Sequence, residues 1–257
     1  MRNPLDLTQR KILVTGASSG IGSAVCQEIA RLGGNVALLG RKEAELDKTR
    51  ELMERPSDHA YFCCDLAQTD SLGDLVASVV KHDGRKIDGF VHAAGIEMTL
   101  PIKFVTHQKF DMLMRLHLYA FVEIIRQLAG GQMGEHGASV VAISSVAASA
   151  GGKCQTVYAA SKGAVDAAII PLSKELAEKG MRINSVQPGL INTPMTERWA
   201  AKKGIEDMRQ LESMQLLGLG RPEDVAHMTT FLLSDASRFI TGRTFPVDGG
   251  GPRDNIF

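Results

Sequence analysis

Short apolar segments alternate with longer amphipathic segments along most of the chain. The apolar segments have aliphatic or β-branched residues on both faces, which is typical of parallel strands covered by helices on both sides. We expect strands in "KILVTG" (11–16), "NVALLG" (35–40), "AYFCCD" (60–65), "IDGFVHAAG" (87–95), "ASVVAISS" (138–145), "RINSVQPG" (182–189) and "GRTFPVDGG" (242–250), and helices over 20–33, 42–54, 68–82, 106–130, 156–180 and 222–234. The pattern predicts an α/β protein with a doubly wound sheet of seven mainly parallel strands and helices on both faces.

Residues 189–221 interrupt this alternation. The segment "GLINTPMTERWAAKKGIEDMRQLESMQLLGLGR" separates the sixth strand from the next helix and carries the only Trp and three of the eleven Met residues. Long excursions in compact α/β domains are functional lids or irregular loops, and the apolar side chains of this segment favour a lid. No repeat, low-complexity tract or linker divides the sequence, so residues 1–257 are expected to form a single domain.

Composition and charge narrow the range of partners. The 257 residues include 29 Lys and Arg against 29 Asp and Glu, without a basic stripe, so neither a nucleic-acid surface nor a polybasic membrane anchor is indicated. No segment resembles a signal peptide or a membrane-spanning helix, and a cytoplasmic protein is the default expectation. The four cysteines lack the paired spacing of a zinc site. We therefore expect reduced, mostly buried thiols, no metal and a small-molecule ligand.

The turn from the first strand into the first helix carries three glycines, in "LVTGASSGIGSAV". Gly16 would permit a tight turn, and Gly20 and Gly22 would let N–H groups at the helix start approach a pyrophosphate. The spacing is G-x-x-x-G-x-G, and not the G-x-G-x-x-G of the common dinucleotide fingerprint. The position after the first strand of a βαβ series favours a dinucleotide-binding loop over the alternative, an ordinary glycine-rich turn.

The end of the second predicted strand bears on the choice of cofactor. An acidic residue there would receive the 2′-hydroxyl of the adenosine ribose and would repel a 2′-phosphate. The sequence instead places Arg41 after Gly40 and has no carboxylate before Glu43. Because a guanidinium suits a phosphate, NADP(H) is favoured over NAD(H). The alternative is that Arg41 and Lys42 form a surface pair at the start of a helix.

A tyrosine and a lysine lie four residues apart in "TVYAASKGA", a segment of small residues. On a helix, Tyr158 and Lys162 would share one face. A free phenol has a pKa near ~10, and a nearby ammonium would stabilise the phenolate and lower that pKa, which suits positioned proton transfer. Taken alone, the pair also fits a packing residue beside a solvated surface charge.

Several motifs together resemble the short-chain dehydrogenase/reductase family over essentially the whole chain. They are "TGASSGIG" (15–22), "CDL" (64–66), "AAG" (93–95), the serine of "ISSVAA" thirteen residues before Tyr158, "YAASK" (158–162), "RINSVQPG" (182–189) and "VDGG" (247–250). The resemblance implies a Rossmann-type fold, a nicotinamide cofactor, and a homotetramer or homodimer.

The resemblance also assigns roles to matching positions. Tyr158 would be the acid that protonates the developing alkoxide, and Lys162 would lower its pKa and bind the nicotinamide ribose. Ser145, rather than Ser144, would hold the substrate oxygen. Asp65 would approach the adenine and Thr193 the carboxamide. The implied cofactor-binding positions are Gly16, Ser18, Ser19, Gly20, Ile21, Gly22, Gly40, Arg41, Asp65, Leu66, Ala94, Gly95, Tyr158, Lys162, Pro188, Gly189, Ile191 and Thr193.

Two positions depart from the family pattern. The fourth strand has His92 and Ala93 where an Asn pair is common. Since that Asn chiefly braces the sheet, we expect a rearranged hydrogen bond and unimpaired activity. The helix over 106–130 has His117 where the family has an Asn as a fourth catalytic residue. His117 is expected to pack in the core or to hold a water, with direct proton transfer as the less favoured alternative.

The predicted substrate pocket consists mostly of small and apolar groups, which suit a ketone or secondary alcohol of moderate size. Its residues are Ala147, the loop 151–155, and Met195, Trp199 and Met214 of the lid, with Lys153 and Gln155 as polar groups. Many relatives reduce 3-oxoacyl-carrier-protein thioesters, and that activity is the leading expectation. However, the stretch before the fifth strand offers no basic residue for docking an acidic carrier protein. A sugar, polyol or steroid-like substrate, and a non-catalytic NADP-binding regulator on the same fold, are the alternatives.

Overall fold

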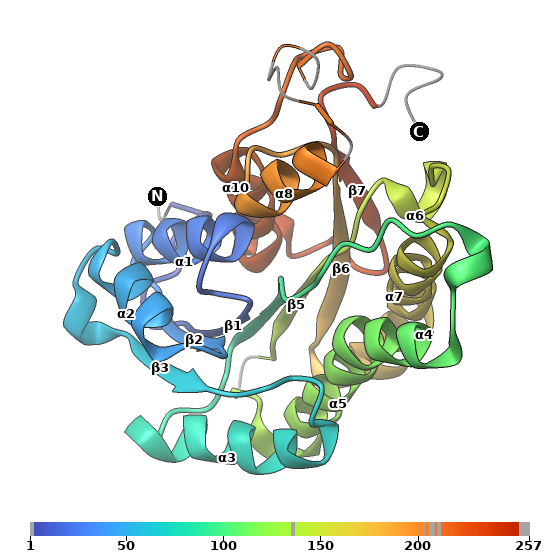
Figure 1. Cartoon of the computed structure of the whole chain (residues 1–257). Coiled ribbons are helices and arrows are strands. Elements are labelled where there is room, and N and C mark those ends of the chain that lie inside the picture. Colours follow the sequence, from blue (N-terminus) through green and yellow to red (C-terminus); the bar gives the residue numbers. More distant parts are fainter. Residues whose placement is uncertain (1–2, 135–136, 203, 206–208, 210–211, 252–257) are drawn as a thin grey trace.

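Seven strands form one sheet at the centre of the molecule (Figure 1). The structure is a computed structural model that describes residues 3–134, 137–202, 204–205, 209 and 212–251. The strands are β1 (Lys11–Thr15), β2 (Asn35–Gly40), β3 (Ala60–Cys63), β4 (Gly89–His92), β5 (Ser139–Ile143), β6 (Arg182–Pro188) and β7 (Thr244–Val247). Their order is β3-β2-β1-β4-β5-β6-β7, and every pairing is parallel. The seven predicted strands are confirmed, and the doubly wound order reverses between β1 and β4, where such sheets leave a crevice at the carboxyl ends.

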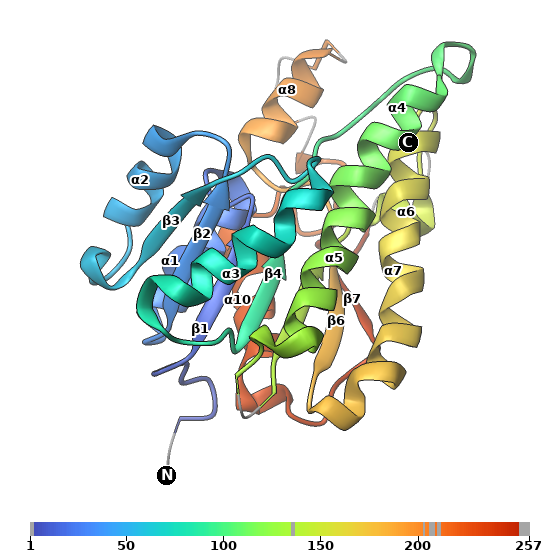
Figure 2. The ribbon, with the colours of Figure 1, turned by 90° about the horizontal axis from the view of Figure 1, so that it is seen from below.

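Helices cover both faces of the sheet (Figures 1 and 2). On one face lie α1 (Gly20–Arg31), α2 (Glu43–Glu51) and α10 (Pro222–Leu233), and on the other lie α3 (Leu72–Asp83), α4 (His107–Met114), α5 (Ala120–Gln127) and α7 (Thr156–Leu176). Strand side chains alternate between the two cores, with Ile12 and Val14 in the core under α1 and α10, and Leu13 in the core under α5 and α7. Among the helices of the described residues, none is long and apolar enough to cross a membrane.

The predicted helix over 106–130 is confirmed, and it contains a π-helical turn. The turn, Arg115–Tyr119, joins α4 to α5, and a second π-type segment, Leu128–Gln132, follows α5. Such turns insert an extra residue into the helical ladder and re-aim the side chains around it. The periodicity did not predict the first π turn, whose backbone accepts a hydrogen bond from the sheet that is described below.

The burial of the cysteines also differs from the prediction. Cys26 is buried in α1, but Cys63 at the end of the edge strand β3 is exposed, and Cys64 and Cys154 are partly exposed. A side chain on an edge strand or a loop lacks one or both flanking elements that would cover it, so the expectation of mostly buried thiols is wrong.

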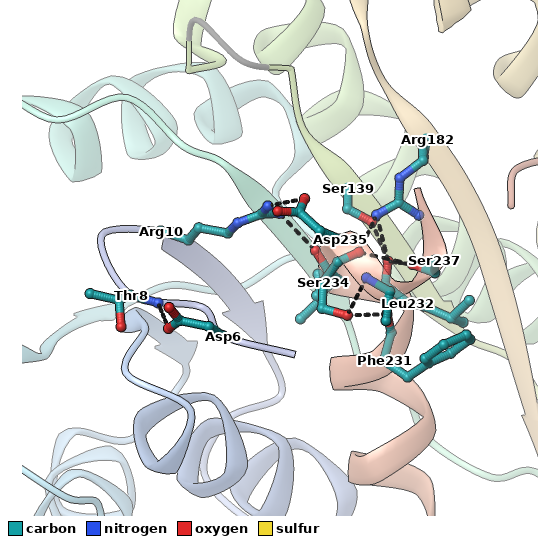
Figure 3. Close-up of polar contacts among 12 residues, drawn as sticks. Asp6, Thr8, Arg10, Ser139, Arg182, Phe231, Leu232, Ser234, Asp235 and Ser237 are labelled. Carbon is teal, nitrogen blue, oxygen red and sulfur yellow. Dashed lines mark hydrogen bonds and ion pairs between the residues drawn. The ribbon is translucent and has the colours of Figure 1, made fainter. Parts of the chain in front are cut away.

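At the amino-terminal edge of the sheet, polar side chains close the end of α10 (Figure 3). Arg10 donates to the carbonyl of Leu233 at 2.9 Å and pairs with Asp235. Arg182 donates to the carbonyls of Leu232 and Ser234 at 2.9 and 3.2 Å. The last carbonyls of a helix have no partners within it, and these guanidinium groups satisfy them while joining α10 to the starts of β1 and β6.

Candidate active site

The predicted catalytic residues gather at the carboxyl ends of the central strands. Ser145 follows β5, and Tyr158 and Lys162 lie on the first two turns of α7. The Lys162 ammonium donates to the carbonyl of Ile143, the last residue of β5, at 2.8 Å. This contact, together with the 3.3 Å hydrogen bond from the Ser144 hydroxyl to the Lys162 carbonyl, holds the start of α7 against the strand end.

The two neighbouring serines point in different directions. Ser144 is buried and donates to the Asp166 carboxylate at 2.8 Å. Ser145 is partly exposed, accepts from the Ala147 N–H at 3.1 Å, and lies near enough to Tyr158 to lower the pKa of its phenol. Ser145 is therefore the serine whose hydroxyl lies beside the tyrosine.

The Tyr158 phenol has an altered acidity. Burial raises its pKa to about 12, the hydrogen bond with Ser145 opposes this rise, and the charge of Glu97 adds to it. The expected direction, a pKa lowered by Lys162, is wrong for this structure, because desolvation of the phenolate outweighs the favourable contacts. At neutral pH the phenol keeps its proton.

Lys162 is a buried cation, with 5% of its surface exposed. Burial lowers its pKa to about 8, and the nearby Asp166 carboxylate partly offsets this effect. Its ammonium has one acceptor, the Ile143 carbonyl, among the residues that the structure describes. An ammonium has three N–H bonds, so two of them remain for other partners.

His117 lies on the π-helical turn and is fully buried. The Ile96 N–H donates to its Nε2 at 3.1 Å, which places the ring proton on Nδ1, and Nδ1–H donates to the Ser161 hydroxyl at 2.8 Å. The ring meets that of Tyr158 edge-on, with centroids 5.9 Å apart. Burial and the Lys162 charge lower the pKa of His117 well below its usual value, so it stays neutral. Both nitrogens are occupied within the protein, which fits the core interpretation of this residue.

His92 makes the rearranged hydrogen bond expected at this position. Its Nε2–H donates to the Leu116 carbonyl in the π turn at 3.1 Å, and its Nδ1 accepts from the Thr15 hydroxyl at 3.0 Å. His92 thus ties β1 and β4 to the segment that carries His117. Burial, followed by the Lys162 charge, lowers its pKa to about 3.

The glycine loop packs closely at the turn from β1 into α1. Gly16 has a φ of +68°, and a Cβ there would lie 2.7 Å from the Ala94 nitrogen. A Cβ on Gly22 would lie 2.1 Å from the Gly16 carbonyl oxygen. No described side chain caps α1 at Ser19, and its first turn carries no acidic residue. The first N–H groups of α1 therefore keep their capacity for an anion, which fits a pyrophosphate.

The end of β2 presents an exposed guanidinium. Arg41 is exposed and forms no ion pair or hydrogen bond with the described residues. The neighbouring cation is engaged, because Lys42 pairs with Glu45 at 2.8 Å. The first carboxylate after β2, Glu43, accepts from the Tyr61 hydroxyl at 2.9 Å. The polar group at this strand end with capacity for a ligand is thus the guanidinium, and its charge suits a phosphate.

The remaining predicted cofactor positions lie in the glycine loop and at or after the carboxyl ends of β2, β3, β4 and β6. Asp65 is exposed, and its carboxylate accepts from the Ala67 N–H at 3.0 Å. Thr193 lies against the glycine loop, where a Cβ on Gly20 would meet its methyl group at 3.3 Å. The others keep the following places: Ser18, Ser19 and Ile21 in the loop and start of α1, Gly40 at the end of β2, Leu66 beyond β3, Ala94 and Gly95 beyond β4, and Pro188, Gly189 and Ile191 at and after the end of β6.

The segment 189–221 contains a helix, α8 (Pro194–Lys202), and a small apolar cluster of its own. Trp199 is buried in that cluster with Met214, so its indole packs within the segment. Gln215, 3% exposed, accepts from the Leu190 N–H at 2.6 Å and joins the two ends of the segment. Residues 203, 206–208 and 210–211 of the predicted lid lie outside the described residues.

Two acidic residues at the site were missed from the sequence. Asp166 accepts from Ser144, Ser185 and Gln187 at 2.7–2.8 Å and anchors α7 to β5 and β6. Its position four residues after Lys162, on the same helix face, was an available signal. Glu97 lies in the loop after β4, and its charge raises the pKa of Tyr158. No sequence spacing indicates this effect, because the two residues lie on different elements.

Comparisons with known proteins show to which family the chain belongs. A family model described as enoyl-(acyl carrier protein) reductase matches residues 16–251. The chain is 32% identical over 239 residues to 3-oxoacyl-(acyl-carrier-protein) reductase FabG of Thermotoga maritima, covering 93% of this chain and 96% of the relative. It is 34% identical over 252 residues to a glucose 1-dehydrogenase of Gluconobacter oxydans, covering 94% and 91%.

A solved structure shows the same fold. This chain superposes with a TM-score of 0.87 on a short-chain dehydrogenase/reductase from Brucella melitensis, a glucose/ribitol dehydrogenase, at 30% identity and over 95% of this chain and 97% of that one. The fold, the ordered motifs and these matches together show that the protein belongs to the short-chain dehydrogenase/reductase family, whose oxidoreductases use nicotinamide cofactors on small-molecule substrates.

Proposed function

We propose that this protein is an NADP(H)-dependent reductase that converts a ketone into a secondary alcohol. The observation that carries the proposal is the meeting of Ser145, after β5, with Tyr158 and the buried Lys162 one turn apart on α7. These are a hydroxyl to hold a carbonyl oxygen, a phenol to protonate it, and a cation beside the phenol.

The protonation state of Tyr158 fits the role of a proton donor. A phenol with an ordinary pKa near ~10, which burial raises to about 12, holds its proton at neutral pH. It would donate that proton to the substrate oxygen as hydride arrives, and Ser145 would hold the same oxygen by a hydrogen bond.

The cofactor would lie across the carboxyl edge of the sheet. The N-terminal turn of α1 would bind the pyrophosphate, Arg41 the 2′-phosphate, Asp65 the adenine, Lys162 the nicotinamide ribose and Thr193 the carboxamide. When bound, a reduced nicotinamide supplies the hydride. Preference for NADP(H) rests on the exposed Arg41 and on the engagement of Glu43 with Tyr61.

His117 is proposed as a positioning residue and not as a proton carrier. Its Nδ1–H donates to Ser161, whose hydroxyl in turn donates to the Tyr158 carbonyl at 2.8 Å. This chain and the edge-on ring contact support the backbone and the ring of Tyr158.

The lid and the assembly complete the proposal. We infer that the described part of the segment 189–221 covers the site, because Thr193 lies on the glycine loop and α8 packs on an apolar cluster separate from both main cores. A homo-oligomer is proposed from exposed apolar side chains on neighbouring helices, which would be covered by a second copy. They are Met112, Tyr119 and Val122 on the α4–α5 helix pair and its π turn, and Ile170 on α7. Light scattering on the purified protein would measure the assembly.

The relatives support two substrate classes. The Thermotoga maritima relative is a 3-oxoacyl-(acyl-carrier-protein) reductase, and the Gluconobacter oxydans relative is a glucose 1-dehydrogenase. Both substrates present an oxygen on a carbon that gains or loses hydride, so the Ser145–Tyr158 pair serves either.

The test measures the reduction of a panel of ketones by the loss of NADPH absorbance. Tyr158→Phe is expected to lower turnover at least about 100-fold, because it removes the donated proton, while NADPH binding survives. Tyr119→Phe is the matched control and should behave as the wild type, because it removes only a hydroxyl and keeps the apolar ring that Tyr119 contributes to the proposed interface. Equal activity of Tyr158→Phe and wild type would remove Tyr158 from the reaction. NADPH binding without reduction of any ketone would favour a non-catalytic regulator.

A further inference from the structure

The loop after β4 is held at both ends by the catalytic region. At one end, the Ile96 N–H donates to the Nε2 of His117, whose ring lies against Tyr158. At the other end, the Leu100 N–H donates to the carbonyl of Cys154 at 2.7 Å, in the loop that leads into α7. Residues 97–99 are thereby held between the two segments that carry His117 and Tyr158.

Glu97 lies in this held stretch and is partly buried. The Thr99 hydroxyl donates to its Oε1. That hydroxyl is the one donor to Glu97 among the described residues, and Glu97 forms no ion pair with any described Lys, Arg or His, whereas Asp166 accepts from three donors. The loop starts at the catalytic groups, since a Cβ on Gly95, two residues before Glu97, would lie 3.1 Å from His117 Nε2 and 3.4 Å from Lys162 Nζ. The charge of Glu97 also raises the pKa of the Tyr158 phenol, which agrees with a carboxylate near the reacting groups.

An incompletely satisfied carboxylate at this place constrains the ligand. Covering it with an apolar group would remove its water and leave the charge without compensation, which is costly. A hydroxyl group would instead donate to the carboxylate. Sites built to hydrogen-bond a substrate hydroxyl discriminate strongly against analogues that lack it.

We propose that Glu97 is a specificity-determining residue that accepts a hydrogen bond from a hydroxyl group of the substrate. The site would therefore take a hydroxylated, sugar-like or polyol-like ketone in preference to a 3-oxoacyl thioester, whose acyl chain has no donor. This inference rests on the proposed ketone reductase function and narrows its substrate class.

The test compares matched ketones in which a hydroxyl replaces a methyl group. The pairs are hydroxyacetone with butanone, and 2-hydroxycyclohexanone with 2-methylcyclohexanone, and acetoacetyl-coenzyme A serves as the thioester. For the wild type, kcat/KM with NADPH should favour the hydroxylated member of each pair by about 10- to 100-fold, the range of a charged hydrogen bond. Glu97→Leu should bring the ratio to about one or below, and Glu97→Gln should give an intermediate ratio.

Glu178→Gln, at an exposed residue beyond the far end of α7, is the matched control and should keep the wild-type ratio. Circular dichroism and NADPH binding would show that each variant is folded. A wild-type ratio near one, or a ratio unchanged in folded Glu97→Leu, would overturn the role of Glu97 while leaving the reductase function intact.

Failure of the proposed reductase function would give a different result in the same assays. If the folded, NADPH-binding wild type reduced no ketone, the reductase proposal would fall. Calorimetric binding of the same pairs to the NADP⁺-saturated protein would then decide on Glu97. A hydroxyl preference lost in Glu97→Leu would support the inference, and equal binding of both members of a pair would refute it.

Discussion

Two buried lysines lie at opposite edges of the sheet, and their surroundings differ. Lys11 at the start of β1 is 4% exposed, pairs with Asp83, and donates to the carbonyls of Val79 and Arg85 at 2.7 and 3.2 Å. Lys162 at the carboxyl edge is 5% exposed and has the Ile143 carbonyl as its one acceptor among the described residues. Burial alone therefore does not separate the two.

The number of acceptors is what separates them. All three N–H bonds of the Lys11 ammonium have partners, as a stably buried charge requires. Lys162 keeps two N–H bonds for other partners, and burial lowers its pKa to about 8. A buried cation with unmet hydrogen-bonding capacity costs stability, and such groups occur where function needs them. The amino edge thus serves the fold, and the carboxyl edge serves the proposed reaction.

Removing the charge at the carboxyl edge should have the largest effect. Lys162→Met is expected to lower ketone reduction at least about 100-fold, because the cofactor and the phenol lose their cation. Its melting temperature at pH 7 should equal or exceed that of the wild type, since a costly buried charge is gone.

The pH dependence of this variant sharpens the test. Folded Lys162 releases its proton near pH 8, whereas the unfolded chain holds it to about 10.5. The unfolded state binds more protons between these values, so wild-type stability should rise relative to Lys162→Met from pH 8 to 10.5. Melts at pH 7, 9 and 10 would measure this. A variant with full activity and a lower melting temperature would invert the comparison between the two edges.

The matching change at the amino-terminal edge of the sheet should lower stability and leave ketone reduction nearly unchanged. Lys11→Met removes the ion pair with Asp83 and the ammonium from which the Val79 and Arg85 carbonyls accept, and should lower the free energy of unfolding by about 1–3 kcal/mol. The loss is smaller than for a fully buried pair, because the Asp83 side chain is 34% exposed. Urea unfolding would measure it. Ketone reduction should stay within about twofold of the wild type, and a variant as stable as the wild type would show that Lys11 is dispensable.

Arg41 tests the cofactor side of the carboxyl edge. Arg41→Ala should weaken NADPH more than NADH by about 1–3 kcal/mol, the usual cost of losing a charged hydrogen bond. Lys42→Ala is the control, because its ammonium already pairs with Glu45 and should not contact the phosphate. Fluorescence titration with both cofactors measures the difference. Equal losses for NADPH and NADH in Arg41→Ala would rule out the phosphate role.

At neutral pH the smallest expected effect concerns His92, whose contribution to stability appears only in acid. The pKa of His92 is lowered to about 3, so below pH 6.5 the unfolded chain binds a proton that the folded chain does not. Stability should therefore fall with decreasing pH, and His92 should contribute a slope of up to about 1.4 kcal/mol per pH unit. His92→Asn should lack this slope in unfolding measurements from pH 7 to 4. The same slope in both proteins would assign the acid sensitivity to other groups.

Much of the fold could be predicted from local patterns in the sequence. The seven strands and six principal helices follow from apolar periodicity, and the ordered motifs from "TGASSGIG" to "VDGG" indicate the family that the comparisons then show. Parallel α/β sheets suit such prediction because each strand and helix is buried by a repeated local arrangement. The roles of Ser145, Tyr158, Lys162 and the cofactor-binding residues stay predictions until tested.

Other features were not predictable because they depend on neighbours distant in the chain. The π turn at Arg115–Tyr119 depends on His92, whose ring holds the Leu116 carbonyl from β4. The raised pKa of Tyr158 depends on its burial and on Glu97 from another loop. The exposure of Cys63 follows from the edge position of β3, which the order of the strands decides.

The sequence by itself determined the class of fold, the family and the identities of the groups available for chemistry, because these depend on periodicity and on motifs within short segments. The tertiary structure decided what each group does. Lys11 meets its carboxylate 72 residues away, while among the residues that the structure covers the Lys162 ammonium meets one acceptor, a carbonyl of β5, 19 residues before it. Whether a buried charge is fully satisfied depends on such distant contacts, and they exist only in the folded chain.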